Sequence, residues 1–310
     1  MSQEIGTSSP PIEATFKARE VEGVLDLYFY RPIGFRLAQL FAKLKLTPSR
    51  VSVLAGICGV AAGHLYYYRD LRVNIAGMAL HVCANALDNA DGQLARLTHR
   101  ESREGRIVDS ICDHLVFASV YLHLALRCWM EGASSAVFLL ALAAAISHAL
   151  QGAAADYYRT TYLHVVAGLR SGFDSSAQLR LELQSRSWRR ALWKKLLLAL
   201  YLSFTRQQEL IAPRLKNLRD ALGRLSGSRC PGWFGERYRE LAAPSLKEWG
   251  LLMTNTRMLV LFFLLFIGQP VWYFWFELGP LNLLLVHLLG RQRKLAETSL
   301  RMLQAQTHPA

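Results

Sequence analysis

Long uncharged apolar runs alternate with short polar and basic segments along most of this chain. About 20 consecutive apolar residues suffice to cross the hydrocarbon core of a membrane as a helix. Six runs are candidates for such helices, at residues 51–68, 74–87, 107–126, 133–155, 249–268 and 271–290. The pattern therefore predicts an all-α integral membrane fold with six transmembrane helices.

The segment before the first run carries too many charges to cross a membrane. Residues 13–48 hold six lysines or arginines interleaved with leucine and aromatic residues. This mixture predicts an amphipathic helix on the membrane surface, next to the first transmembrane helix. Pro32 and Gly34 predict a break within it, and residues 1–12 are expected to be a disordered tail. Because this start lacks an apolar core, we expect no cleaved signal peptide.

A second polar region separates the fourth apolar run from the fifth. Residues 159–248 contain 17 lysines or arginines and seven aspartates or glutamates, an excess of ten positive charges. The apolar stretch 196–204 inside it is too short to span. We therefore expect transmembrane helices 1–4 within residues 49–158, a basic cytoplasmic helical insertion at 159–248, helices 5 and 6 within 249–290, and a cytoplasmic tail at 291–310.

Composition and charge sharpen this reading. The 310 residues are 52% hydrophobic and carry a formal charge of +13, which excludes a disordered chain and disfavours a soluble nucleic-acid-binding domain. Lysine and arginine are concentrated in the N-terminal segment, the loop after the second run, the insertion and the tail. The positive-inside rule then places both termini in the cytoplasm, with a bacterial inner membrane as the expected location. Five cysteines without a CxxC pair indicate neither a disulfide framework nor a zinc site.

Four aspartates flank the loop between the second and third runs. Asp88 and Asp91 are three residues apart, and Asp109 and Asp113 are four apart, so each pair shares one face of a helix. A loop of about a dozen residues joins the two helices, which must then lie side by side. We expect all four carboxylates to converge at the cytoplasmic membrane boundary.

Clustered carboxylates near a membrane repel one another unless a cation neutralises them. Hard oxygen ligands suit Mg²⁺ or Mn²⁺, and two metal ions bridged by carboxylates suit phosphoryl chemistry. Gly92 and Gly105 fit points where a ligand or a neighbouring helix approaches the backbone. Arg96 is placed to hold a phosphate oxygen.

These residues form one spaced pattern, D-x2-D-G-x2-A-R-x8-G-x3-D-x3-D. Its eight positions are Asp88, Asp91, Gly92, Ala95, Arg96, Gly105, Asp109 and Asp113. The pattern resembles the signature of the CDP-alcohol phosphotransferases, also called CDP-alcohol phosphatidyltransferases, with no departure at any position. The segment 45–52, KLTPSRVS, is also similar to the approach to the family's first transmembrane helix. The six-span layout agrees with the family fold, whereas the insertion at 159–248 has no counterpart in its compact members.

The resemblance implies a mechanism. A CDP-linked donor would bind with its pyrophosphate on a two-metal site of Mg²⁺ or Mn²⁺, an acceptor hydroxyl would attack the phosphorus distal to cytidine, and CMP would leave. Asp88, Asp91 and Asp109 would be metal ligands, and Asp113 would be the general base and a further contact to metal. The residues expected to hold CDP are Gly92, Ala95, Arg96 and Gly105.

Other candidate residues have two interpretations each. Asn85, one turn before Asp88, faces either the nucleotide or the packed interior. Arg257 either binds an acceptor or lipid phosphate or extends to the interface. Asp156 and Arg159 either line the acceptor site or anchor a helix end at the interface.

The family resemblance favours a phospholipid-synthesis enzyme that transfers a phosphatidyl group from CDP-diacylglycerol to a small alcohol. The alternative within the family moves the head group of a CDP-amino-alcohol or CDP-polyol to a lipid hydroxyl such as diacylglycerol. A cation transporter is the rival of a different class, but carboxylates at one membrane face beside Arg96 argue against alternating access. Expected partners are membrane lipids and a second copy of the chain, and nucleic acid is not expected.

Overall fold

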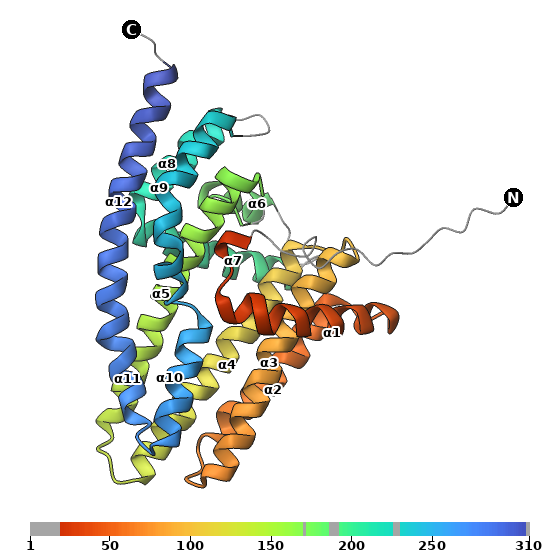
Figure 1. Cartoon of the computed structure of the whole chain (residues 1–310), viewed down its shortest axis with the longest axis vertical. Helices are drawn as coiled ribbons and strands as arrows, with labels where there is room; N and C mark the ends of the chain where they lie inside the picture. The colour runs from red at the N-terminus through yellow and green to blue at the C-terminus, as the bar shows by residue number, and fades with distance from the viewer. Residues whose placement is uncertain (1–18, 170–171, 186–191, 226–229, 308–310) are drawn as a thin grey trace, which may run out of the picture.

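The computed structural model describes residues 19–169, 172–185, 192–225 and 230–307, in which all regular secondary structure is helical and no strand occurs. The expected all-α fold is confirmed. The tail at 1–12 lies outside the described residues. Figure 1 shows a tall bundle of helices, with α12 along one side and α2 and α3 on the other.

The N-terminal segment forms a short helical turn, a break at residues 22–23, and then a continuous helical path from Val24. A 3₁₀ turn, η2 (Arg19–Val21), is followed by a π-helical turn, η3 (Asp26–Tyr30), which continues directly into α1 (Arg31–Lys43). The break expected at Pro32 and Gly34 is wrong. Pro32 lies in the first turn of α1, directly after the π-helical turn, and the helix continues through it. A Cβ at Gly34 would lie 3.2 Å from the backbone of α3, so this glycine lets α1 cross α3 closely.

Four long helices follow: α2 (Pro48–Leu65), α3 (Leu71–Leu97), α4 (Arg103–Met130) and α5 (Ala136–Ala167). Side-chain caps fix two of their starts, because Asp70 accepts from the backbone N–H of Arg72 and Ser102 from that of Gly105. Only residues 98–102 separate α3 from α4, so the expected loop of about a dozen residues is an overestimate. Arg96 consequently belongs to the last turn of α3.

Small residues allow α2 to pack closely against α4. Gly56, Gly59 and Gly63 recur along one face of α2 and meet Cys112, Val116 and Ser119 of α4. At Gly63 a Cβ would lie 2.9 Å from the backbone nitrogen of Val120, a contact that a side-chain rotation cannot relieve. This close approach fixes the position of the α4 segment that carries Asp109 and Asp113.

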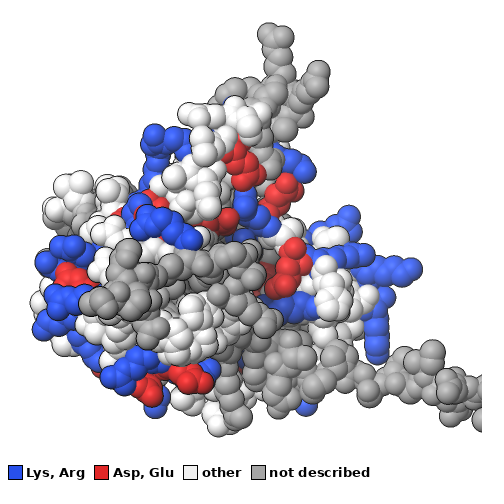
Figure 2. Space-filling view, turned by 90° about the horizontal axis from the view of Figure 1, so that it is seen from above, with Lys and Arg blue, Asp and Glu red and all other residues white. Residues whose placement is uncertain are grey.

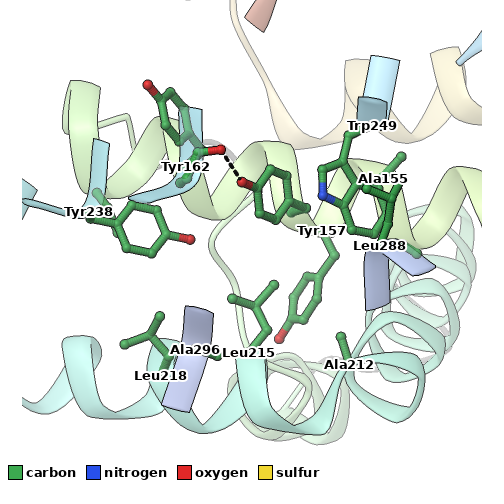
Figure 3. Packing of buried hydrophobic residues seen from close by; sticks show 14 of the residues in the cluster. Ala155, Tyr157, Tyr162, Ala212, Leu215, Leu218, Tyr238, Trp249, Leu288 and Ala296 are labelled. Carbon is green, nitrogen blue, oxygen red and sulfur yellow. Dashed lines mark hydrogen bonds between the residues drawn. The ribbon is translucent and has the colours of Figure 1, made fainter. Parts of the chain in front are cut away.

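The remaining helices are α6 (Ser176–Ser185), α7 (Leu192–Ile211), α8 (Pro213–Leu225), α9 (Gly232–Gly250), α10 (Thr254–Phe266), α11 (Val271–Leu278) and α12 (Pro280–Thr307). The largest core cluster joins α5, α8, α9 and α12 (Figure 3). Within it Tyr158 stacks on Trp249 at 5.0 Å between ring centroids and donates a hydrogen bond to the Ala242 carbonyl. Within residues 159–248, α5 continues to Ala167 and α9 begins at Gly232, with α6, α7 and α8 between them.

Among the described residues, four helical segments are long and apolar enough to cross a membrane. They are Arg103–Met130, Ala136–Ala167, Gly232–Phe266 and Val271–Ala305. These segments overlap the third to sixth predicted runs, and they indicate an integral membrane protein. Neither α2 nor α3 is among them, so the six-span layout stays a prediction.

A buried ion pair ties α10 to α11. Arg257 Nε lies 3.0 Å from Glu277 Oε1, and the two side chains are 3% and 0% exposed. The same guanidinium donates to the Leu252 carbonyl and to Gln151 Oε1 on α5. Its donors are therefore used inside the protein, where it holds three segments together.

Replacing Gly63 with alanine should destabilise the fold, because the added methyl group meets the α4 backbone. We expect a loss of about 1–3 kcal/mol, the usual range for overpacking, seen as a lower thermal unfolding midpoint in detergent micelles. Gly152→Ala in α5 is the matched control, since no atom lies within 4 Å of the position that a Cβ would take there. Equal stability of the two variants would contradict the close α2–α4 packing.

Replacing Arg257 with leucine should leave the Glu277 carboxylate buried without its cation. Removing one partner of a buried pair costs about 3–5 kcal/mol, so the unfolding midpoint in micelles should fall steeply. The double variant Arg257→Leu/Glu277→Leu should recover part of this loss, because no isolated charge remains. A single variant as stable as the parent would show that the pair does not stabilise the fold.

Candidate functional site

A cavity of about 340 Å³ opens between α2, α3 and α4, with the N-terminal segment and α5 on its other sides. Residues 253–255, just before and at the start of α10, complete its wall. Its charged lining residues are Glu22, Asp26, Arg31, Asp88, Asp91, Arg96, Asp109, Asp113, Asp156 and Arg159. Acidic and basic side chains thus face one enclosed space.

Three carboxylates converge on one side of this cavity. Oxygen atoms of Asp88, Asp91 and Asp109 all lie within 4.8 Å of one another. Asp91 is the most enclosed, at 5% exposed, and it accepts a hydrogen bond from the Ser52 hydroxyl of α2. Asp113 lines the same cavity one turn further along α4, outside this trio and with an exposed side chain.

Helix spacing and close packing explain this convergence. Asp88 and Asp91 lie on one face of α3, and Asp109 and Asp113 on one face of α4, as their separations require. The five-residue connection at 98–102 reverses the chain between the two helices. Because α2 packs against both α3 and α4, which do not pack closely on each other, the expected side-by-side packing of the two aspartate helices is wrong, and α2 positions them instead. Gly56 of α2 meets Cys112, which lies between the two α4 aspartates in the sequence, so α2 and α4 approach each other closely beside them.

The trio has the donor set and the spacing for a divalent cation. Oxygen ligands about 2.1 Å from Mg²⁺ lie at most about 4.2 Å apart in an octahedral site. The 4.8 Å limit observed here needs only a small closure of the side chains. Three like charges in a partly buried site also repel one another strongly, and a divalent cation would relieve that repulsion. Asp88, Asp91 and Asp109 therefore fit a metal site.

Arginines occupy the neighbouring part of the cavity. Arg96 and Arg159 line it together with Arg31, and the Nε atoms of Arg96 and Arg159 are buried without a hydrogen-bond partner. Burial, followed by the nearby charge of Arg31, lowers the pKa of Arg96 to about 10, so the group stays cationic at neutral pH. Two guanidinium donors next to the carboxylates are therefore unused.

The remaining motif positions fall into two groups. Gly92 lines the cavity, and a Cβ there would lie 3.5 Å from the Arg96 guanidinium. Ala95 and Gly105 do not line it. Gly105 instead opens α4, where its backbone N–H bonds Ser102 Oγ at 2.9 Å. These two positions act on the site through the helices that carry them.

The candidate residues outside the motif fall into two groups, those that line the cavity and one that does not. Asn85, Asp156 and Arg159 all line the cavity, although Asn85 donates to Met258 Sδ at 3.3 Å. Arg257 is not among the lining residues. Its guanidinium is buried and paired with Glu277. It therefore neither faces a lipid phosphate nor extends to the membrane interface.

Sequence patterns alone did not identify several lining residues. Ser52 falls within the segment 45–52 that resembles the family, but its contact to Asp91 depends on how α2 packs. Glu22 and Arg31 reach the cavity only because the N-terminal segment folds back over it. Gln208 of α7 donates to Asp156 Oδ2 at 3.0 Å, which links the polar region after α5 to the cavity.

Comparison with known proteins agrees with this geometry. Residues 45–170 match the sequence profile of the CDP-alcohol phosphatidyltransferase family, and all four aspartates lie in that segment. The chain is 33% identical over 91 residues to an archaetidylinositol phosphate synthase of Pyrococcus horikoshii, covering 29% of this chain and 47% of the relative. It is 29% identical over 148 residues to a bifunctional IPC transferase and DIPP synthase of Thermococcus kodakarensis, covering 47% of this chain and 33% of the relative.

The chain thus spans less than half the length of either curated relative. The matched segment nevertheless supplies most of the residues that line the cavity, because α2, α3, α4 and α5 all fall within it. Sequence motif, carboxylate geometry and family match coincide on the same residues. Residues 45–170 of this chain thus match the CDP-alcohol phosphatidyltransferase family, and the four aspartates of the motif lie in the matched segment.

Proposed function

We propose that this protein transfers a substituted phosphate group from a CDP-linked donor to an alcohol and releases CMP. The observation that carries the proposal is the convergence of Asp88, Asp91 and Asp109 within 4.8 Å, inside the family segment and beside Arg96. The carboxylates would hold Mg²⁺ or Mn²⁺, which would neutralise the donor pyrophosphate and stabilise charge on the reacting phosphate. Arg96 would hold a phosphate oxygen, and Gly92 would leave room for it.

The proposed proton acceptor is Asp113. It lies one helical turn from Asp109 on the same face of α4, and its exposed side chain leaves space for an alcohol to approach. The alcohol oxygen would form a bond to phosphorus while its proton passes to the Asp113 carboxylate. The bond from phosphorus to the CMP oxygen would break, and CMP would leave as the anion. Asp113 would later release the proton to water.

For the substrates, we propose a lipid-linked CDP donor such as CDP-diacylglycerol and a small polar alcohol as acceptor. A transfer onto an alcohol is consistent with the name of the Pyrococcus relative, which describes synthesis of an inositol-containing archaetidyl lipid phosphate. Asn85, Asp156 and Arg159 line the cavity beyond the carboxylates and would contact the donor or the acceptor.

We further propose that α2 and α3 complete a six-span membrane domain with the cavity on the cytoplasmic side. The exposed basic residues of α1 and its flanks support this orientation, since cytoplasmic boundaries collect lysine and arginine. They are Arg36, Lys43, Lys45 and Arg50. Figure 2, which looks down on the upper end of the molecule in Figure 1, shows Lys and Arg side chains around much of that face.

Metal binding can be tested without turnover. Asp91→Asn and Asp109→Asn should each weaken Mn²⁺ binding by more than about tenfold, because each removes a charged oxygen ligand. Electron paramagnetic resonance of free Mn²⁺, titrated with purified protein, measures this directly. Asp156→Asn lines the same cavity outside the trio and should bind Mn²⁺ as the parent does. Equal affinity in all variants would place the metal elsewhere.

Activity can be tested as CMP release in micelles with Mg²⁺ and a panel of CDP-linked donors and alcohols. Asp91→Ala and Asp113→Ala should lower the rate by at least about a hundredfold, the lower range for loss of a general base. Chelation of Mg²⁺ should have the same effect. Glu240→Gln, which alters an exposed pair with Arg237, should keep the parent rate. Full turnover by the Asp113 variant would exclude it as the base.

A further inference from the structure

The N-terminal segment places a carboxylate among the arginines of the cavity. Glu22 Oε1 lies 2.7 Å from Arg31 Nη2 and 3.6 Å from Arg159 Nη2. The Glu22 side chain is 3% exposed, so solvent does not screen these contacts. One carboxylate therefore bridges two guanidiniums that come from different helices, α1 and α5.

Residues 19–26 form a strap along the wall of the cavity, which Glu22 and Asp26 line, and both ends of the strap are held. On one side Glu20 accepts a hydrogen bond from the Tyr162 hydroxyl and lies 3.4 Å from Arg239 Nε. On the other side the segment continues into η3, where Tyr30 is buried at 1% exposed. The strap thus positions Glu22 without depending on Glu22 itself.

The arginine cluster has more donors than Glu22 uses. Arg31, Arg96 and Arg159 all line the cavity, and the buried Nε atoms of Arg96 and Arg159 have no hydrogen-bond partner. Guanidinium groups bind phosphate through paired N–H donors, and a phosphate offers more oxygens and more charge than one carboxylate. A phosphate group would therefore satisfy this cluster better than Glu22 does.

We propose that Arg31, Arg96 and Arg159 form a phosphate-binding site in which Glu22 is an internal competitor that an incoming phosphate displaces. The inference deepens the proposed function, because the phosphate would belong to the CDP-linked donor or to a phosphorylated acceptor. Displacement of Glu22 would break its contacts to Arg31 and Arg159, whereas Glu20 and Tyr30 would still hold the strap in place.

The direct test measures binding of inorganic phosphate to the purified full chain in micelles at saturating Mg²⁺, by isothermal titration calorimetry. Glu22→Gln keeps the shape of the side chain and removes its charge, and it should bind phosphate at least about tenfold more tightly. Glu297→Gln is the matched control, because it removes one carboxylate that pairs with Arg214 and Arg293 outside the cavity. Its phosphate affinity should equal that of the parent.

The tighter phosphate binding expected of Glu22→Gln must depend on the arginines. Glu22→Gln/Arg159→Gln should lose the gain, and Arg159→Gln alone should bind more weakly than the parent. Unchanged or weaker phosphate binding by Glu22→Gln, with a parent-like unfolding midpoint, would overturn the inference. The inference would also be overturned if Glu22→Gln tightened phosphate binding equally in the parent and in the Arg159→Gln background.

Turnover then identifies the source of the phosphate. Glu22→Gln should lower the KM of the donor if the cluster holds a donor phosphate, and the KM of a phosphorylated acceptor if it holds that group. An unchanged KM for both would contradict a substrate site. Absence of CMP release from every donor would reject the proposed function but leave the phosphate titration intact, so the two failures are distinguishable.

Discussion

Repulsion among clustered carboxylates is the constraint on which the rest of this structure depends. Asp88, Asp91 and Asp109 place oxygens within 4.8 Å of one another at a partly buried position. Such a group is unfavourable by itself, because nearby like charges and lost hydration both oppose ionisation. The protein sustains it with rigid packing around it and with cationic side chains beside it.

The rigid packing comes from small residues. Gly56, Gly59 and Gly63 let α2 lie directly against α4, and Gly34 lets α1 cross α3. Ser52 of α2 then reaches Asp91 and donates to it. Remote elements reinforce the same frame, because the buried pair of Arg257 and Glu277 joins α10 to α11 and the aromatic core joins α5 to α9 and α12. Flexible carboxylates are thereby held where a cation and a phosphate can meet.

Much of this was predictable from sequence because helical periodicity is local. Spacings of three and four residues fixed which face carries Asp88, Asp91, Asp109 and Asp113, and long apolar runs predicted the helices. The predicted loop length and the predicted helix break at Pro32 were wrong, because the cap at Ser102 begins α4 early and the chain stays helical through Pro32. The partner of Arg257 and the return of Glu22 to the cavity depend on tertiary packing, which no local pattern encodes.

The central claim is that these carboxylates hold the metal on which a CDP-linked substrate binds. Its most direct test is an anomalous difference map of crystals grown with Mn²⁺ and a CDP-alcohol. We predict Mn²⁺ peaks in contact with Asp88, Asp91 and Asp109, with the pyrophosphate against them and toward Arg96. A bound nucleotide with no Mn²⁺ at these three residues, or with Mn²⁺ only elsewhere, would contradict the claim.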